Sequence, residues 1–325
     1  MHPEARRRPS SLSVALWSCV ALNACGDDSN TSSGGAGSGG SPTAGGAGPG
    51  GSGAGTTEGG AGAGAGGAGG GGAGPGSGAG APVGSEGCGV AATDPLATWT
   101  LKTVDVGGVT REYFVYLPEG YDPATPYPIV YQFHGCSGGP DKQNNNPPVQ
   151  DQAGDQAIHV RGRAVGDCWD TSAQGPDVAF FDAMVSAMEQ GTCADPERRF
   201  VTGYSSGAFM THVLSCQRGD EIRGVASIAG GQGGSGCTGK VAALLIHDAN
   251  DSVVGIATSE QARDRYLAEN GCALTTTPYD PAPCVRYDGC EAGLPVVWCQ
   301  TTGQDHSRQD GLSAPAFWGF LSTLP

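Results

Sequence analysis

Positive charge is scarce in this sequence. Lysine and arginine together number 17 among 325 residues, against 32 acidic residues, and the formal net charge is −15. Only three lysines occur, Lys102, Lys142 and Lys240. Proteins that bind nucleic acid or an anionic membrane surface through charge need clustered basic residues. The composition therefore excludes a basic nucleic-acid-binding surface, and we expect no nucleic-acid partner.

Apolar runs long enough to cross a bilayer are also missing. The run Leu12–Leu22 is too short for a membrane-spanning helix. It follows the basic Arg6–Arg8 and precedes a small-residue site that ends in Cys25, a pattern that resembles a bacterial lipoprotein signal. We expect residues 1–25 to be a lipoprotein-type signal, with an acylated Cys25 as the only membrane contact. Export without a lipid is the alternative.

Metal and cofactor motifs are absent as well. Cys284 and Cys290 have no partner at the tight spacing of a zinc site, and no cluster of histidine and cysteine accompanies them. No cysteine occupies a strand-to-helix turn of the kind that presents a catalytic nucleophile. We expect neither a metal nor a cofactor.

Glycine, in contrast, is abundant. Between Gly34 and Gly80, 26 of 47 residues are glycine, with alanine, serine, proline and threonine making up most of the rest. No collagen-like register with abundant proline is present. Such a composition cannot bury enough apolar surface to offset the entropy of ordering, so residues 26–84 are predicted to be a disordered linker. We expect this linker to hold a folded domain, residues 85–325, away from a membrane.

Residues 85–325 are sufficient for one α/β domain. Apolar strand-like segments alternate with helical ones, which favours a mainly parallel sheet with helices on both faces. Asp177 is predicted to cap the N-terminus of a helix over 178–190. The expected strands are 99–106, 111–117, 128–134, 199–202, 222–229, 241–247 and 296–299, and the other expected helices are 206–216, 257–270 and 313–324.

Ten cysteines lie in this domain, an even number that favours disulfides in an exported protein. They are Cys88, Cys136, Cys168, Cys193, Cys216, Cys237, Cys272, Cys284, Cys290 and Cys299. Their spacing leaves the pairing open. We expect the domain to be monomeric.

The segment Phe200–Met210 contains the pattern Gly-x-Ser-x-Gly between a strand-like and a helix-like run. This is the pattern of a nucleophile elbow, in which the serine lies on a sharp turn with its hydroxyl exposed. Gly203 and Gly207 allow the tight turn and the close approach of strand and helix. By itself the pattern is weak evidence in a chain with 58 glycines. Its context identifies Ser205 as the candidate nucleophile.

A serine nucleophile needs a histidine base and an acid that orients the histidine. Where a serine follows a strand in this way, the acid and then the histidine come later in the chain. That order selects Asp251 and His306. Asp248 is the competing acid and His247 the competing base, although a histidine at the end of a core strand more often anchors the neighbouring loop. His212, on the helix after Ser205, is predicted to be structural.

An oxyanion hole needs two N–H donors close to the nucleophile. The backbone N–H of Ser206 is one candidate. The other is the N–H of Cys136, in a His-Gly-Cys sequence that follows an early strand.

Five segments together resemble a family of secreted bacterial and fungal esterases, the polyhydroxybutyrate depolymerases and the feruloyl or acetylxylan esterases of carbohydrate esterase family one. The segments are 134–136, 168–170, 177–181, 203–207 and 247–254, in the family's order. The resemblance covers roughly residues 98–325 and implies an α/β-hydrolase fold and ester hydrolysis through an acyl-enzyme. It also implies Ser205, Asp251 and His306 as the triad. Asp248 and Asp305 replace residues that are usually glycine in the family.

We therefore expect an exported serine esterase that acts on feruloyl or acetyl esters of plant polysaccharide. A polyhydroxyalkanoate depolymerase is the alternative within the same chemistry. A surface binding protein that has lost activity is the alternative of another class, and a serine peptidase on the same fold is a third. Retention of the serine, the acid, the histidine and the His-Gly loop favours an enzyme over a binding protein.

Overall fold

The structure is a computed structural model in which residues 84–325 are described, except Pro140 and Ser235. The predicted signal, Cys25 and nearly all of the predicted linker lie outside the described residues. Within the described range, none of the helices combines the length and the apolar character that crossing a bilayer requires.

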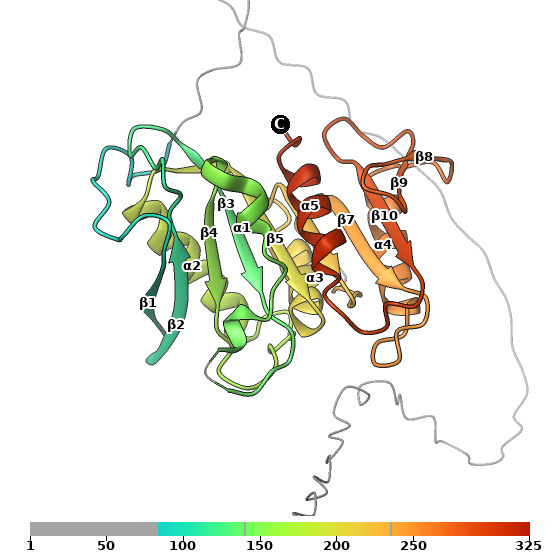
Figure 1. Cartoon of the computed structure of the whole chain (residues 1–325), viewed down its shortest axis with the longest axis horizontal. Coiled ribbons are helices and arrows are strands. Elements are labelled where there is room, and N and C mark those ends of the chain that lie inside the picture. Colours follow the sequence, from blue (N-terminus) through green and yellow to red (C-terminus); the bar gives the residue numbers. More distant parts are fainter. Residues whose placement is uncertain (1–83, 140, 235) are drawn as a thin grey trace, which may run out of the picture. The chain divides into compact units, whose positions relative to one another are not determined.

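A ten-stranded sheet forms the centre of the folded region, in the spatial order β1-β2-β4-β3-β5-β6-β7-β10-β9-β8 (Figure 1). Six neighbouring strands, β4 to β10 in that order, run parallel. Antiparallel strands flank them at both edges. The strands are β1 Trp99–Val106, β2 Val109–Tyr116, β3 Tyr127–Phe133, β4 Ile158–Gly162, β5 Ala194–Tyr204, β6 Gly224–Ile228, β7 Ala242–Asp248, β8 Thr276–Pro278, β9 Cys284–Tyr287 and β10 Val296–Thr301.

Helices cover both faces of the sheet, as predicted. In Figure 1, α1 and α5 lie in front of the sheet and α2, α3 and α4 behind it. Each face has its own apolar cluster, one built with Phe181, Met210 and Tyr266 from the rear helices and one with Val149 and Phe317 from the front helices. The helices are α1 Val149–Ala153, α2 Pro176–Gly191, α3 Ser206–Gln217, α4 Ala257–Glu269 and α5 Asp310–Leu321, with short 3-10 turns at Lys142–Asn144 and Gly154–Gln156.

Most predicted elements are present, whereas α1, β4, β8 and β9 were not expected, and two of the predicted helices differ in detail. The helix cap assigned to Asp177 is wrong, because α2 begins at Pro176 with Gly175 as its N-cap. The Asp177 carboxylate is instead paired with Arg111 of β2, 2.6 Å away. The closing helix begins at Asp310 and ends at Leu321, earlier at both ends than predicted.

Five disulfides join all ten cysteines of the described region, which confirms the disulfide-containing fold. Two bridges lie before Ser205 in the chain and three after it. The pairs are Cys88–Cys193, Cys136–Cys168, Cys216–Cys237, Cys272–Cys290 and Cys284–Cys299.

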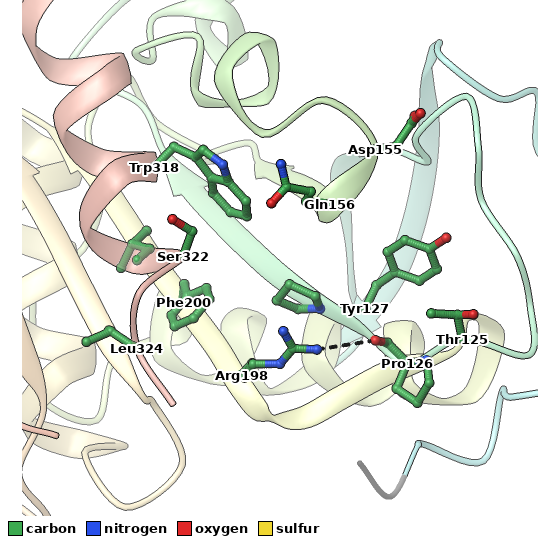
Figure 2. A pocket seen from close by; sticks show the side chains of 12 residues that line it. Thr125, Pro126, Tyr127, Asp155, Gln156, Arg198, Phe200, Trp318, Ser322 and Leu324 are labelled. Carbon is green, nitrogen blue, oxygen red and sulfur yellow. Dashed lines mark hydrogen bonds between the residues drawn. The ribbon is translucent and has the colours of Figure 1, made fainter. Parts of the chain in front are cut away.

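A pocket of about 350 Å³ opens at the amino ends of the parallel strands (Figure 2). Tyr127 of β3, Phe200 of β5 and Trp318 of α5 line it, together with the polar Gln156 and Arg198. Parallel α/β sheets place their ligands at the carboxyl ends of the strands. Ser205 lies at the carboxyl end of β5, so this pocket is at the other ends of the strands, and none of the predicted triad residues lines it.

Candidate active site

Ser205 lies in the sharp turn between β5 and α3. Its backbone has φ 53° and ψ −119°. This is the positive-φ half of the Ramachandran map, where a residue with a side chain is strained. The Ser205 N–H donates to the carbonyl of Ile228 at 3.0 Å, which fixes the turn against β6. The turn has the geometry expected of a nucleophile elbow.

The two glycines that flank Ser205 are required by close packing. A Cβ at Gly203 would lie 2.1 Å from the carbonyl oxygen of Gly207, and a Cβ at Gly207 would lie 1.8 Å from that of Phe133. Both contacts are with backbone atoms, which cannot move aside without shifting β3, β5 or α3. The start of α3 is therefore pressed against the carboxyl end of β3.

The structure brings together Ser205, His306 and Asp251. His306 Nε2 is 2.9 Å from Ser205 Oγ, and His306 Nδ1 is 2.8 Å from Asp251 Oδ2. The Asp251 side chain is fully buried, whereas the His306 side chain is 14% exposed. This is the hydrogen-bonded order of nucleophile, base and acid, and it comes from three loops at the carboxyl ends of β5, β7 and β10.

Asp251 is held by its own loop. Its Oδ1 accepts the N–H groups of Val253 and Val254, at 2.9 and 2.8 Å, which leaves Oδ2 for His306. His247, at the end of β7, bonds the Val254 carbonyl through Nε2 and the Ser259 hydroxyl through Nδ1. Burial lowers the pKa of His247 below its ordinary value. His247 thus supports the acid loop and makes no contact with Ser205.

Asp248 lies outside the hydrogen-bonded triad and holds the loop that carries His306. Its Oδ2 accepts the Gln304 N–H at 2.9 Å and the Thr301 hydroxyl at 3.0 Å. Burial alone would raise the pKa of Asp248, but these hydrogen bonds outweigh it and lower the pKa below its ordinary value. Asp248 is therefore an ionised residue that positions the base loop.

Two further contacts fix His306. The Tyr204 hydroxyl donates to the His306 carbonyl at 3.2 Å, and the two rings lie 5.4 Å apart between centroids. The Asp305 carboxylate accepts the Ser252 N–H at 2.8 Å, which ties the His306 loop to the Asp251 loop. Neither contact is predictable from local sequence patterns, because both join segments that are distant in the chain.

The two predicted oxyanion donors are backbone N–H groups that follow the neighbouring parallel strands β3 and β5. Cys136 follows the carboxyl end of β3, and Ser206 is the first residue of α3. Within the described part of the chain, neither backbone N–H donates a hydrogen bond to another protein group. Both remain available to an external acceptor, as an oxyanion hole requires.

The other histidines of the described region are structural. His134, His159 and His212 are completely buried. Burial lowers their pKa values to about 4, about 3 and about 3, so all three are neutral at pH 7. His212 bonds the Tyr266 hydroxyl and the Ser227 hydroxyl and makes no contact with Ser205, in line with its predicted structural role. Among the described residues, no group of three or more metal-ligating side chains is assembled.

The curated proteins that are similar to this chain include several feruloyl esterases. Feruloyl esterase D of Neurospora crassa is 31% identical over 269 residues, which cover 74% of this chain and 91% of that protein. A probable feruloyl esterase C of Aspergillus niger is 33% identical over 237 residues, which cover 65% of this chain and 83% of that protein. No model of a known protein family matches the chain.

Solved structures bear on the fold. An acetyl xylan esterase from Aspergillus awamori superposes with a TM-score of 0.55 at 16% identity, covering 69% of this chain and 99% of that one. A thermostable esterase superposes with a TM-score of 0.50 at 15% identity, covering 69% of this chain and 60% of that one. At such low identity the likeness speaks for architecture alone, and it confirms the α/β-hydrolase fold that the sequence predicts.

Proposed function

The chain belongs to the feruloyl esterase family of serine carboxylic ester hydrolases, and from that premise we propose that it hydrolyses feruloyl or acetyl esters of plant polysaccharide through Ser205, His306 and Asp251. The observation that carries this proposal is the continuous hydrogen-bonded chain from Ser205 Oγ through both ring nitrogens of His306 to Asp251 Oδ2. The names of the similar curated proteins support feruloyl esters as the substrate class.

In the proposed first step, His306 Nε2 takes the proton from Ser205 Oγ while Oγ attacks the ester carbonyl. The buried Asp251 carboxylate orients the imidazole through Nδ1 and stabilises the imidazolium that forms. The N–H groups of Cys136 and Ser206 receive the negative charge on the carbonyl oxygen. The imidazolium then protonates the leaving alcohol, and an acyl-enzyme remains on Ser205.

In the second step, water attacks the acyl-enzyme with His306 again as base. The carboxylic acid leaves and Ser205 regains its proton, so the cycle needs no cofactor. Asp248 and His247 take no proton in this cycle. They hold the loops that place His306 and Asp251.

The test is hydrolysis of a short p-nitrophenyl ester and of methyl ferulate by the exported full-length protein, beside Ser205→Ala. We expect the wild type to hydrolyse both esters and the variant to fold and hydrolyse neither. A clear rate on methyl ferulate supports a feruloyl ester, and turnover of the short ester alone favours acetyl esters or a polyhydroxyalkanoate. A fully active Ser205→Ala contradicts the mechanism. If the folded wild-type protein hydrolyses neither ester, the binding-protein alternative is favoured.

The five disulfides support an extracytoplasmic location, because disulfides persist in oxidising compartments. We propose further that residues 1–25 are a lipoprotein-type signal, that Cys25 carries the lipid, and that residues 26–84 tether a monomeric domain, residues 85–325. Cys25→Ala should abolish incorporation of labelled fatty acid while leaving esterase activity intact. Equal labelling of the variant and the wild type would contradict the anchor.

A further inference from the structure

A short segment between β4 and α2 contacts both candidate oxyanion donors. Cys168 is joined by a disulfide to Cys136. The next residue, Trp169, donates its backbone N–H to the Ser206 hydroxyl at 3.0 Å. The two donors come from the ends of different strands, yet consecutive residues of one segment, Cys168–Asp170, hold them both.

The Trp169 side chain adds a third attachment. Its indole N–H donates to the His134 carbonyl at 2.8 Å, two residues before Cys136. The ring packs edge-on against Phe133 of β3, with 4.8 Å between centroids, and the residue is only 5% exposed. Trp169 therefore fixes the carboxyl end of β3 as well as the first turn of α3.

The Cys168–Asp170 segment is itself held by a buried ion pair between Arg111 and Asp177. The Asp170 N–H donates to Asp177 Oδ2 at 2.7 Å, and Arg111 donates to Asp177 Oδ1 at 2.6 Å. The side chains of Arg111 and Asp177 are 2% and 7% exposed. A buried ion pair of this kind contributes little net stability compared with apolar packing, but it imposes a specific geometry. Here the Asp177 carboxylate directs the backbone of Asp170.

We propose that the Cys168–Asp170 segment is the positioning element of the oxyanion hole. It sets the separation and direction of the Cys136 and Ser206 N–H groups, and it acts through them without touching the substrate. This inference rests on the proposed function, because only a reaction that develops an oxyanion requires the two donors to be held together. Fixed donors stabilise such charge best, since they need no reorganisation when the charge appears.

The test uses two variants of the full-length protein. Ser206→Ala removes the hydroxyl that accepts the Trp169 N–H, and Trp169→Phe removes the indole N–H while an aromatic ring remains. The measurements are kcat and KM on p-nitrophenyl acetate, and inhibition by a trifluoromethyl ketone that forms a tetrahedral adduct with Ser205.

Each variant should lower kcat about tenfold, less than the ~10²–10³-fold that follows complete loss of one donor. KM should stay within about twofold, and the inhibition constant of the ketone should rise by the same factor as kcat/KM falls. If the two residues had a purely structural role, the variants would have a lower melting temperature, but their folded fraction would keep the wild-type kcat, KM and inhibition constant.

The matched control removes a disulfide at the far edge of the sheet, as Cys272→Ala with Cys290→Ala. It should lower the melting temperature and keep the wild-type kcat. Unchanged kcat and ketone affinity in Ser206→Ala and Trp169→Phe overturn the positioning role, as does an equal fall of kcat in the control. Ser205→Ala, measured beside them, keeps the two proposals apart. If only Ser205→Ala is inactive, the proposed function stands while the positioning role fails.

Discussion

The two sides of the candidate site are held by different kinds of interaction. On the oxyanion side, a disulfide and the buried Trp169 fix Cys136. On the acid–base side, none of the five described disulfides reaches the loop that carries His306, and hydrogen bonds to Asp248 and Tyr204 hold it. The difference matches the tasks, because oxyanion donors stabilise charge best when fixed, whereas the imidazole must exchange a proton with successive partners.

The largest effect should come from Asp251→Asn, on the side without a disulfide. The amide cannot stabilise the imidazolium and favours the wrong ring tautomer, so kcat should fall by about 10³–10⁴-fold. Steady-state kinetics on p-nitrophenyl acetate, with circular dichroism to verify folding, measure this. A fall of less than tenfold in a folded variant would mean that another group orients His306.

A smaller effect is expected for Asp248→Asn, which keeps the size of the side chain but removes its charge. The hydrogen bonds from Gln304 and Thr301 weaken, and His306 loses part of its support. We expect kcat to fall about tenfold and the free energy of unfolding to fall by about 1.5–3 kcal/mol, the range for hydrogen bonds to a charged group. Asp105→Asn, at an exposed turn in the β1–β2 hairpin, is the control. A larger loss of kcat in Asp248→Asn than in Asp251→Asn would reverse the assignment of the acid.

The smallest effect concerns acid stability on the oxyanion side. The neutral ring of His134 bonds the Gly135 carbonyl through Nδ1 and accepts the Ala164 N–H through Nε2. Burial lowers the pKa of His134 to about 4, while the unfolded chain takes up this proton near pH 6.5. Between these values the unfolded state binds more protons, so stability falls as pH falls, by about 1.4 kcal/mol per pH unit from this group.

Urea unfolding of the wild type and His134→Gln at pH 7, 6 and 5 measures that contribution. The wild type should lose more stability than the variant over this range, since glutamine does not titrate. Parallel pH dependences of the two proteins would show that His134 has the same pKa in the folded and unfolded states, which would contradict the lowered pKa.

Local sequence patterns were sufficient for the parts of the fold that depend on neighbours in the chain. The β1–β2 hairpin turns at Gly107 and Gly108, both at positive φ, and α4 is followed by Gly271 at φ 66°. These are positions where glycine is favoured because it has no Cβ. The alternation of strands and helices likewise predicts the parallel sheet and its order of loops, and so the meeting of Ser205, Asp251 and His306.

What the sequence could not supply depends on contacts between distant segments. Strand β4 was not predicted, since its five residues include His159 and Arg161. These polar side chains are buried because they bond Gln132 of β3. The local pattern around Asp177 predicts a helix cap, but its carboxylate forms an ion pair with Arg111 of β2, which is distant in the chain. The pairing of ten cysteines has many solutions by spacing alone.

The five disulfides fall into two groups along the chain, although all the strands belong to one sheet. The bridges of Cys88 and Cys136 close within residues 88–193, and the other three close within residues 216–299. None of these five bridges crosses residues 194–215, which contain Ser205. The domain is thus two crosslinked halves with one peptide connection, and each half carries part of the site. Ester turnover would therefore report whether the halves are docked, even while every disulfide is intact.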